Sequence, residues 1–426
     1  MKKNVKKTVH PLFGRKMFVP RMSTVGAEAL CAAFRSFGIE AVVTPLADEK
    51  AKIKASRFTT GEECLPQRIT LADFFKAMDT PDFDPTRVAF FMPTSSGPCR
   101  FGQYANLFRK ILRELGYSEI YVFSPTSSNQ YEDIGANVIR FKRTAWRAVV
   151  VSDALRKLTY QFRPYAKDPH AVDSIHDDAL QALCKILENP DISLQTQMDR
   201  LTGILEMTRD QILGLSFAEP PGTRPLIGVV GEIFIRFNSE SNQHLIRKIE
   251  AHGGEVWIAD VSEWVWYTSL EQVRRLKESR KSFSLSMLGA LLRNAFQRWD
   301  EEKILSPLKE VFKHRKEARV ETILQYSRPY LPHEKAMGEM TLNTGKAIAF
   351  YRAGCDGVID ASPFTCMNGI VTEAVYPQVS QDCEGMPIRI FYFDGVPLDL
   401  DAALEIFMEL AREYRTKRMK RKSIAE

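Results

Sequence analysis

Cys99 stands where a thiolate could do chemistry. It lies in Ser95-Ser-Gly-Pro-Cys-Arg-Phe-Gly-Gln-Tyr104, between a Gly-Pro turn and the expected start of a helix. A sulfur at such a place gains from free backbone N–H groups, from the helix dipole and from Arg100, all of which should lower the pKa of the thiol. These features favour a metal ligand or a nucleophile over a cysteine that only packs.

Two further cysteines have the same local context. Cys366 lies in Pro363-Phe-Thr-Cys-Met-Asn-Gly369, and Cys64 lies in Gly61-Glu-Glu-Cys-Leu-Pro-Gln-Arg68, ahead of helical spacing. Iron–sulfur clusters are held by cysteine thiolates, usually four. We therefore expect Cys64, Cys99 and Cys366 to converge on one [4Fe–4S] cluster. Three protein ligands would leave one iron open to water or to a substrate oxygen, which suits chemistry better than passive electron storage.

The other four cysteines are weaker candidates. Cys31 and Cys184 fall on apolar faces of expected helices, where free cysteines are usually core residues. Cys355, in Gly354-Cys-Asp-Gly357, and Cys383, in Gln381-Asp-Cys-Glu-Gly385, lie in expected loops near Cys366. Either of these two could supply a fourth ligand.

Zinc is the competing metal, because His333 or His252 could complete a site of three cysteines and one histidine. Structural zinc sites, however, usually draw their cysteines in close pairs such as Cys-x2-Cys, and this sequence has none.

A different kind of binding segment is Gly231-Glu-Ile-Phe-Ile-Arg-Phe-Asn238, which follows an expected strand and begins a helix. Glu232 and Arg236 are its candidates for binding an anion or an acyl group. The glycines do not form Gly-x-Gly-x-x-Gly and the Walker pattern is absent, so we expect no dinucleotide site and no ATP site. The pattern singles out no catalytic acid or base.

Length and composition limit the classes of protein to which this chain can belong. The 426 residues are too many for one ordinary core, and the seven cysteines are an odd number that does not indicate a disulfide framework. No apolar run approaches the length of a membrane span and no secretory signal is apparent, so we expect a cytoplasmic protein.

The net charge of +6 does not predict a nucleic-acid partner. Four lysines among residues 1–7 and a net +6 over residues 412–422 together give +10, so the rest of the chain carries −4. A nucleic-acid protein usually spreads positive charge over its folded body.

The elements that must position these cysteines alternate in type. Expected strands at 16–20, 38–44, 88–92 and 119–123 are interleaved with helical spacing at 27–37, 71–78 and 104–115. Residues 143–215 read as long helices and end in the breaker segment 219–225. Strands at 225–230, 255–259, 357–360 and 387–393 then alternate with helices at 243–252, 270–317, after Pro363 and from Leu398.

This alternation predicts an α/β protein with two Rossmann-like parallel-sheet domains and a helical insertion. The predicted boundaries are 1–142 for the N-terminal α/β domain, 143–222 for the helical insertion and linker, and 223–426 for the C-terminal α/β domain. Ligands of open α/β sheets bind beyond the carboxyl ends of strands, and both Cys99 and Cys366 follow strands.

Four motifs together resemble one known family. They are Glu63-Cys64-x-Pro66, Gly97-Pro-Cys-Arg-Phe-Gly-Gln-Tyr104, Gly231-Glu-Ile with Arg236 and Asn238, and Pro363-Phe-x-Cys-Met-x-Gly369. The chain resembles the cluster-bearing subunits of the 2-hydroxyacyl-CoA dehydratase superfamily, in particular the module that follows the ATPase domains in activase-related proteins. The resemblance covers most of the chain and is weakest over 143–218.

The resemblance implies a [4Fe–4S] cluster on Cys64, Cys99 and Cys366, in an oxygen-sensitive protein. It also implies a separate ATP-dependent activase as the electron-donating partner, an acyl-CoA as candidate substrate, and a homo- or heterodimer with a related subunit. Two alternatives stay open. One is a non-catalytic electron-transfer or accessory module, and the other is a double-cubane-cluster reductase of small molecules, which would need about six thiolates.

Overall fold

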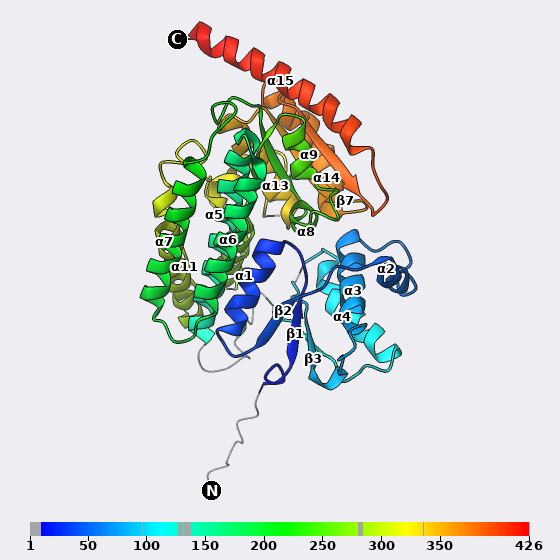
Figure 1. The fold of residues 1–426 in the computed structure, drawn as a ribbon. Coiled ribbons are helices and arrows are strands. Elements are labelled where there is room, and N and C mark those ends of the chain that lie inside the picture. The colour runs from blue at the N-terminus through cyan, green and yellow to red at the C-terminus, as the bar shows by residue number, and fades with distance from the viewer. Residues whose placement is uncertain are drawn as a thin grey trace.

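Two four-stranded parallel sheets carry the fold, and helices cover both faces of each (Figure 1). This is a computed structural model of the chain. It describes residues 10–95, 97–126, 131, 138–279, 284–334 and 336–425. The predicted class, α/β with two Rossmann-like parallel-sheet domains, is confirmed. The basic segment 1–9, which enters the charge argument, lies outside the described residues.

The N-terminal sheet has the order β2-β1-β3-β4. Its strands are β1 (Lys16–Val19), β2 (Glu40–Val43), β3 (Val88–Phe91) and β4 (Tyr121–Phe123), close to the predicted segments. Helix α1 (Thr24–Arg35) covers one face, and α3 (Leu65–Met78) and α4 (Phe101–Glu114) cover the other. The short α2 (Glu49–Ser56), which the sequence analysis did not predict, packs on α3.

The C-terminal sheet repeats this order as β6-β5-β7-β8. Its strands are β5 (Leu226–Gly231), β6 (Glu255–Ile258), β7 (Gly357–Pro363) and β8 (Ile388–Phe393). Helices α8 (Ile233–Phe237), α9 (Leu245–Ala251) and α15 (Leu400–Ala425) share a core with one face. Helices α13 (Glu339–Arg352) and α14 (Met367–Asp382) cover the other face. Both β5 and β7 are buried along most of their length, and β5 accordingly has a continuous apolar sequence, whereas β7 contains the buried polar residues Asp360 and Ser362.

A helical layer lies beside both sheets (Figure 1). It consists of α5 (Val138–Phe162), α6 (Pro169–Glu188) and α7 (Leu194–Leu213), joined by α10 (Val261–Glu278), α11 (Leu285–Ile304) and α12 (Val320–Ser327). Helices α5, α6 and α7 share one core with α1 of the N-terminal sheet, and α11 packs on α5 and α7. The predicted helical stretch 143–215 is thus real, but its core is continuous with the N-terminal sheet and receives a helix from beyond residue 223.

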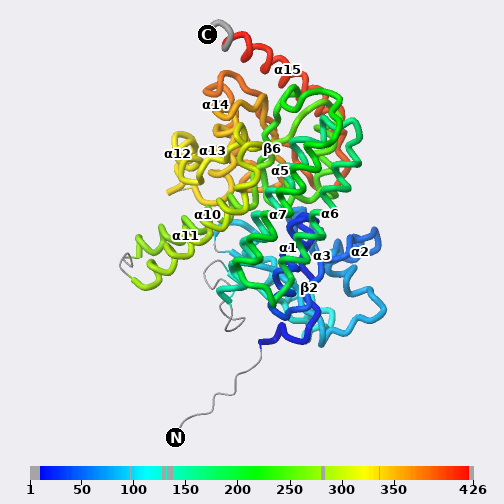
Figure 2. Tube along the Cα trace, turned by 60° about the vertical axis from the view of Figure 1, so that its left-hand side comes forward, coloured from blue at the N-terminus to red at the C-terminus, as the bar shows by residue number. Residues whose placement is uncertain are grey.

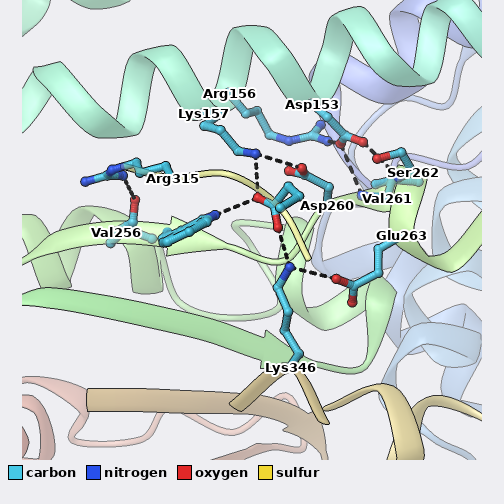
Figure 3. A network of polar contacts seen from close by, with 12 residues as sticks. Asp153, Arg156, Lys157, Val256, Asp260, Val261, Ser262, Glu263, Arg315 and Lys346 are labelled. Atoms are coloured by element: carbon cyan, nitrogen blue, oxygen red, sulfur yellow. Dashed lines mark hydrogen bonds and ion pairs between the residues drawn. The ribbon is translucent and has the colours of Figure 1, made fainter. Parts of the chain in front are cut away.

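Buried charges fasten this layer to the C-terminal sheet. The Lys157 ammonium of α5 lies 3.0 Å from the Asp260 carboxylate at the end of β6 and also contacts Glu317. The Lys346 ammonium of α13 lies 2.7 Å from the Glu263 carboxylate and contacts Glu317 from the other side. Figure 3 shows Lys157 and Lys346 pointing toward each other from opposite sides of this network.

Glu317 is the centre of the network. Burial opposes its ionisation, but Lys157 and Lys346 outweigh burial and lower the pKa of Glu317 to about 2. The Trp257 indole N–H donates to the same carboxylate at 2.7 Å. Because each charge has an opposite partner, we interpret the network as a structural anchor for α5 and α13.

Across the part of the chain that the structure describes, no helix combines the length and the apolar character needed to cross a membrane.

Candidate metal centre

The carboxyl ends of the two sheets face each other (Figure 1). In each sheet the connections leave in opposite directions from two neighbouring central strands, β1 and β3 in one and β5 and β7 in the other. Such switch points are where open α/β sheets bind ligands. Direct contacts join the two edges: the Asn238 amide donates to the Arg21 carbonyl at 2.6 Å, and Arg68 donates to the Asp394 carbonyl at 3.2 Å.

All three predicted ligands lie at this junction, each where a helix begins. Cys64 is the N-cap of α3, Cys366 is the N-cap of α14, and Cys99 precedes Arg100, the N-cap of α4. Neither Cys64 nor Cys366 makes a side-chain capping hydrogen bond. The turn-then-helix context predicted for each cysteine is confirmed.

Arg100 ties the three cysteine loops together. It follows Cys99, and its guanidinium donates to the Glu62 carbonyl in the loop of Cys64. The same nitrogen makes a longer contact of 3.5 Å to the Thr365 hydroxyl, next to Cys366. Two loops of the N-terminal domain and one loop of the C-terminal domain therefore meet at one side chain. The Cys64 sulfur is in addition hydrogen-bonded to the Tyr104 hydroxyl of α4.

The expected lowering of the cysteine pKa values is wrong for this protein. Burial raises the pKa of Cys99 to about 11, although the Phe101 N–H opposes the shift, and Glu339 and Glu232 add to it. Burial likewise raises the pKa of Cys64 and of Cys366. Cys99 keeps an exposed surface, but protein atoms pack around its sulfur closely enough for desolvation to exceed the effect of the helix start.

Thiol side chains are suitable metal ligands, but the three cysteines are not arranged as a complete metal-binding site. Within the described residues, no group of three or more Cys, His, Asp or Glu side chains is positioned to hold a metal ion. Backbone N–H groups favour the thiolate at each sulfur: Gln67 at Cys64, Phe101 at Cys99, and Gly369 and Asn368 at Cys366. Since the thiols are protonated at neutral pH, a metal would have to displace their protons and draw the loops together.

Two half-buried carboxylates adjoin the cysteines. Glu232 caps α8 and accepts the Ile235 N–H at 2.9 Å, while Glu339 begins α13 and accepts the Ile233 N–H at 3.2 Å. Burial, with Glu232 adding to it, raises the pKa of Glu339 to about 8, and burial raises the pKa of Glu232. The structure therefore places two acids that hold their protons readily beside the three thiols.

The turn before Glu232 depends on a glycine. Gly231 has φ +120°, and a Cβ there would come within 2.1 Å of the Ala361 carbonyl oxygen in β7. Only glycine lets β5 approach β7 this closely and still direct Glu232 toward the junction.

Sequence reasoning missed Glu339, because it predicted no helix or strand between residues 317 and 357, where α13 lies. A signal was present: Gly338-Glu339 repeats the Gly231-Glu232 dipeptide, and both pairs begin helices. Asp360 was also missed. It is fully buried near the carboxyl end of β7 and accepts hydrogen bonds from Ser362 at 2.6 Å and from Tyr376 at 2.7 Å.

Arg236 is an unusual cation. Only 4% of it is exposed, yet its Nε has no hydrogen-bond partner among the described residues, and its guanidinium lies over the Phe237 ring at 5.0 Å. Glu232, Glu339 and Asp360 all feel its charge. A buried guanidinium with an unused N–H is suited to receive an anionic or carbonyl oxygen.

The remaining cysteines lie elsewhere. Cys31 is fully buried in the core of α1, and Cys184 packs against the same core, as predicted. Cys355 and Cys383 are buried in the core around α13 and α14, at the amino ends of β7 and β8. Cys366 follows the carboxyl end of β7, and a seven-residue strand is roughly 20 Å long, so neither can share its site. The open question of a fourth thiolate from these two is settled against both.

Neither candidate zinc histidine forms a group with the cysteines that could hold a metal within the described residues. His252 precedes β6, at the amino edge of the C-terminal sheet, and lies 3.3 Å from the Asp401 carboxylate. His333 lies beside Glu334 in the segment between α12 and α13. A hollow of about 770 Å³ beside β4, lined by Arg109, Arg113 and Tyr121 among others, does not include any of the cysteines.

The fold and this junction define a two-domain, doubly wound α/β protein with thiols and carboxylates between its facing sheet edges. No protein-family model matches the chain, and none of the curated proteins matches it either.

Proposed function

We propose that this chain holds a [4Fe–4S] cluster on Cys64, Cys99 and Cys366 and acts as a component resembling a 2-hydroxyacyl-CoA dehydratase subunit. In this role it would receive low-potential electrons from a separate ATP-dependent activase and use them for radical dehydration or reduction of an acyl-CoA. The cluster, when bound, would supply one-electron chemistry and an iron with an open position.

The contact of Arg100 with the loops of both other cysteines carries this proposal. Cysteines that are 35 and 267 residues from Cys99 come to one junction, and each begins a helix with its sulfur free of capping bonds. Four other cysteines, by contrast, are core residues. Of the seven cysteines, only Cys64, Cys99 and Cys366 therefore both lie at one junction and have backbone N–H groups that favour the thiolate.

The neighbouring side chains suit an acyl substrate. The Arg236 guanidinium has the unused N–H that a thioester or carboxylate oxygen needs. Burial raises the pKa of Glu339 to about 8 and also raises the pKa of Glu232, which suits these carboxyls to donating a proton to a leaving hydroxyl or taking one from a carbon acid. The proposal assigns Arg236 to orienting the substrate and the two carboxyls to moving protons.

A non-catalytic electron-transfer module is the second candidate, and a double-cubane reductase is the third. A carrier would be expected to close its cluster with a fourth thiolate, but Cys355 and Cys383 lie at the opposite edge of their sheet. A double cubane would need about six thiolates, and the core positions of Cys31 and Cys184 oppose that count. Both alternatives are therefore less well supported than the single open cluster.

Anaerobic purification followed by iron and sulfide analysis tests the proposal. We expect about four irons and four sulfides per chain, because that is the content of one [4Fe–4S] cluster. Stoichiometric zinc without sulfide would contradict it. A change in the cluster spectrum on adding an acyl-CoA would favour the enzyme over the carrier, and an unchanged spectrum would favour the carrier.

A further inference from the structure

Helix α11 carries a row of large apolar side chains that face solvent. Leu285 is 87% exposed, and the other members are 42% to 54% exposed: Leu288, Leu291, Leu292, Phe296 and Trp299. The opposite side of the helix packs on α5, α7 and α10. Single exposed apolar residues are ordinary, but six on three to four consecutive turns form a continuous patch.

The size of this patch is that of an interface. Together the six side chains expose roughly 600 Å² of mostly apolar surface, at or above the largest patch of a typical monomer. A standard protein interface buries about 800 Å² per partner, of which somewhat more than half is apolar. The patch therefore supplies the apolar part of one such interface without help from other surfaces.

The two halves of the patch have complementary shapes. In Figure 2, α11 projects sideways from the body of the molecule. Its first turns carry the most exposed leucine, Leu285. Its later turns border a hollow of about 530 Å³ lined by Leu292, Phe296 and Trp299 of α11, by Arg143 of α5 and by Leu194 of α7, among others. The protruding half of one molecule could thus fill the hollow of another.

The spacing of the row is the same in both directions. Five of its six members, Leu285, Leu288, Leu292, Phe296 and Trp299, follow intervals of three, four, four and three residues. When two such helices pack antiparallel about a two-fold axis through Leu292, Leu285 faces Trp299 of the second copy, and Leu288 faces Phe296 of the second copy. An isologous interface requires this self-complementarity.

Charge does not oppose that pairing. Between residues 285 and 299 the charged residues are Arg293 and Arg298. In the two-fold arrangement they fall opposite Leu291 and Ser286 of the second copy, so like charges do not face each other. The Arg143 guanidinium already lies over the Phe296 and Trp299 rings, at 5.3 and 5.9 Å, and would form a polar rim of the hollow.

We propose that two copies of this chain associate through α11 as an antiparallel, two-fold symmetric dimer with Leu292 on the axis. The exposed leucines of the first turns of each copy fill the hollow beside Phe296 and Trp299 of the other. This inference is independent of the proposed cluster, because none of the cysteines lies on α11.

Sedimentation velocity of the full chain tests the dimer. The parent protein should sediment as a dimer at micromolar concentration. Leu292→Glu places two carboxylates face to face on the axis and should weaken association by at least about 100-fold, giving monomers with an unchanged circular dichroism spectrum. Ile406→Glu is the matched control, since Ile406 is an equally exposed apolar residue on α15, and it should stay dimeric.

A cross-link keeps the test decisive if Leu292→Glu fails to fold. Leu292→Cys sets two thiols across the axis, and mild oxidation should join the chains in high yield, whereas Ile406→Cys should not cross-link above the level of the parent. A parent that sediments as a monomer would overturn the proposal. A folded Leu292→Glu variant that remains dimeric, or a Leu292→Cys variant that does not cross-link more than Ile406→Cys, would overturn it as well.

Discussion

The carboxyl edges of the two sheets have the same design but different chemistry. In each sheet, one helix comes just before the third strand of the chain order, β3 or β7, and another helix comes just after it. All four of these helices begin at the junction. The helices after the third strands, α4 and α14, both begin next to a cysteine, Cys99 and Cys366. Of the helices before them, α3 begins at Cys64, whereas α13 begins at Glu339.

This comparison separates what the topology supplies from what the residue type supplies. Parallel strands with crossover helices put helix N-termini, with their free N–H groups, at one edge in any such sheet. The residue at that place then decides the chemistry. The N-terminal edge contributes two thiols, and the C-terminal edge contributes one thiol and two carboxylates, to the junction for which we propose metal binding and proton transfer.

The two edges are also anchored differently. Helix α3 is held by apolar packing: Phe74 stacks on Phe90 of β3 with ring centroids 4.1 Å apart. Helix α13 is held by the buried Lys346 and its carboxylate partners. The apolar contact itself contains no group that titrates, whereas a buried ion pair requires that both partners stay charged.

The largest expected effect is loss of the metal. Replacing Cys64, Cys99 or Cys366 by Ala should in each case remove most of the iron from anaerobically purified protein, because each thiolate is one of the three proposed ligands. Cys31→Ala and Cys355→Ala should keep full iron and cost about 1–2 kcal/mol of stability as small core changes. If Cys366→Ala kept its iron and sulfide, the C-terminal edge would not take part in the centre.

The next largest expected effect is on the stability that the buried ion pairs of Lys346 on α13 contribute. Lys346→Met leaves Glu317 and Glu263 with one cation fewer in a buried site, and we expect the free energy of unfolding to fall by about 3–5 kcal/mol. Urea denaturation measures it. The control Lys417→Met breaks an exposed pair on α15 and should change stability by less than about 0.5 kcal/mol. Equal effects of the two variants would mean that the network does not anchor the helix.

A pH-dependent effect is expected at α3. Asp73 accepts the Ala47 N–H at 3.0 Å, and burial raises its pKa from 3.8 to about 7, against the opposing effect of that hydrogen bond. Because the folded state binds this proton more tightly than the unfolded state, the stabilisation is fully present below pH 3.8 and is lost as the pH rises through about 7.

Asp73→Asn keeps the hydrogen-bond acceptor and removes the titration. Between pH 5 and pH 8 its stability should therefore decline less than that of the parent, by about 2 kcal/mol, in urea denaturation at a series of pH values. Asp84→Asn, at an exposed loop carboxylate of the same domain, is the control and should follow the parent. A parent-like slope for Asp73→Asn would show that this carboxyl is already ionised at pH 5.

The smallest expected effect concerns Arg236. Because Arg236 forms no ion pair among the described residues, Arg236→Met should change the free energy of unfolding by no more than about 1 kcal/mol, while weakening any response of the protein to an acyl-CoA. Arg147 provides the contrast: it is as deeply buried but paired with Asp300 at 2.9 Å, and Arg147→Met should cost about 3–5 kcal/mol. If both variants lost equal stability, Arg236 would be a structural residue.

Local sequence patterns were enough to predict the structure around the candidate ligands. Apolar runs marked seven of the eight strands to within about two residues and the eighth, β7, by its first half. The Gly-Pro, Pro-x-x-Cys and Cys-x-Pro patterns placed each of the three cysteines at a helix start. These features depend on neighbours a few residues apart, so they can be predicted without the fold.

Tertiary structure alone decided what surrounds those cysteines. Glu339 reaches Glu232 across more than 100 residues of chain, and burial by both domains reverses the pKa shift expected for Cys99 from its turn. The same holds for Cys355, which is near Cys366 in sequence but separated from it by the length of β7. Desolvation and long-range contacts depend on which surfaces pack together, and a local sequence pattern does not predict that packing.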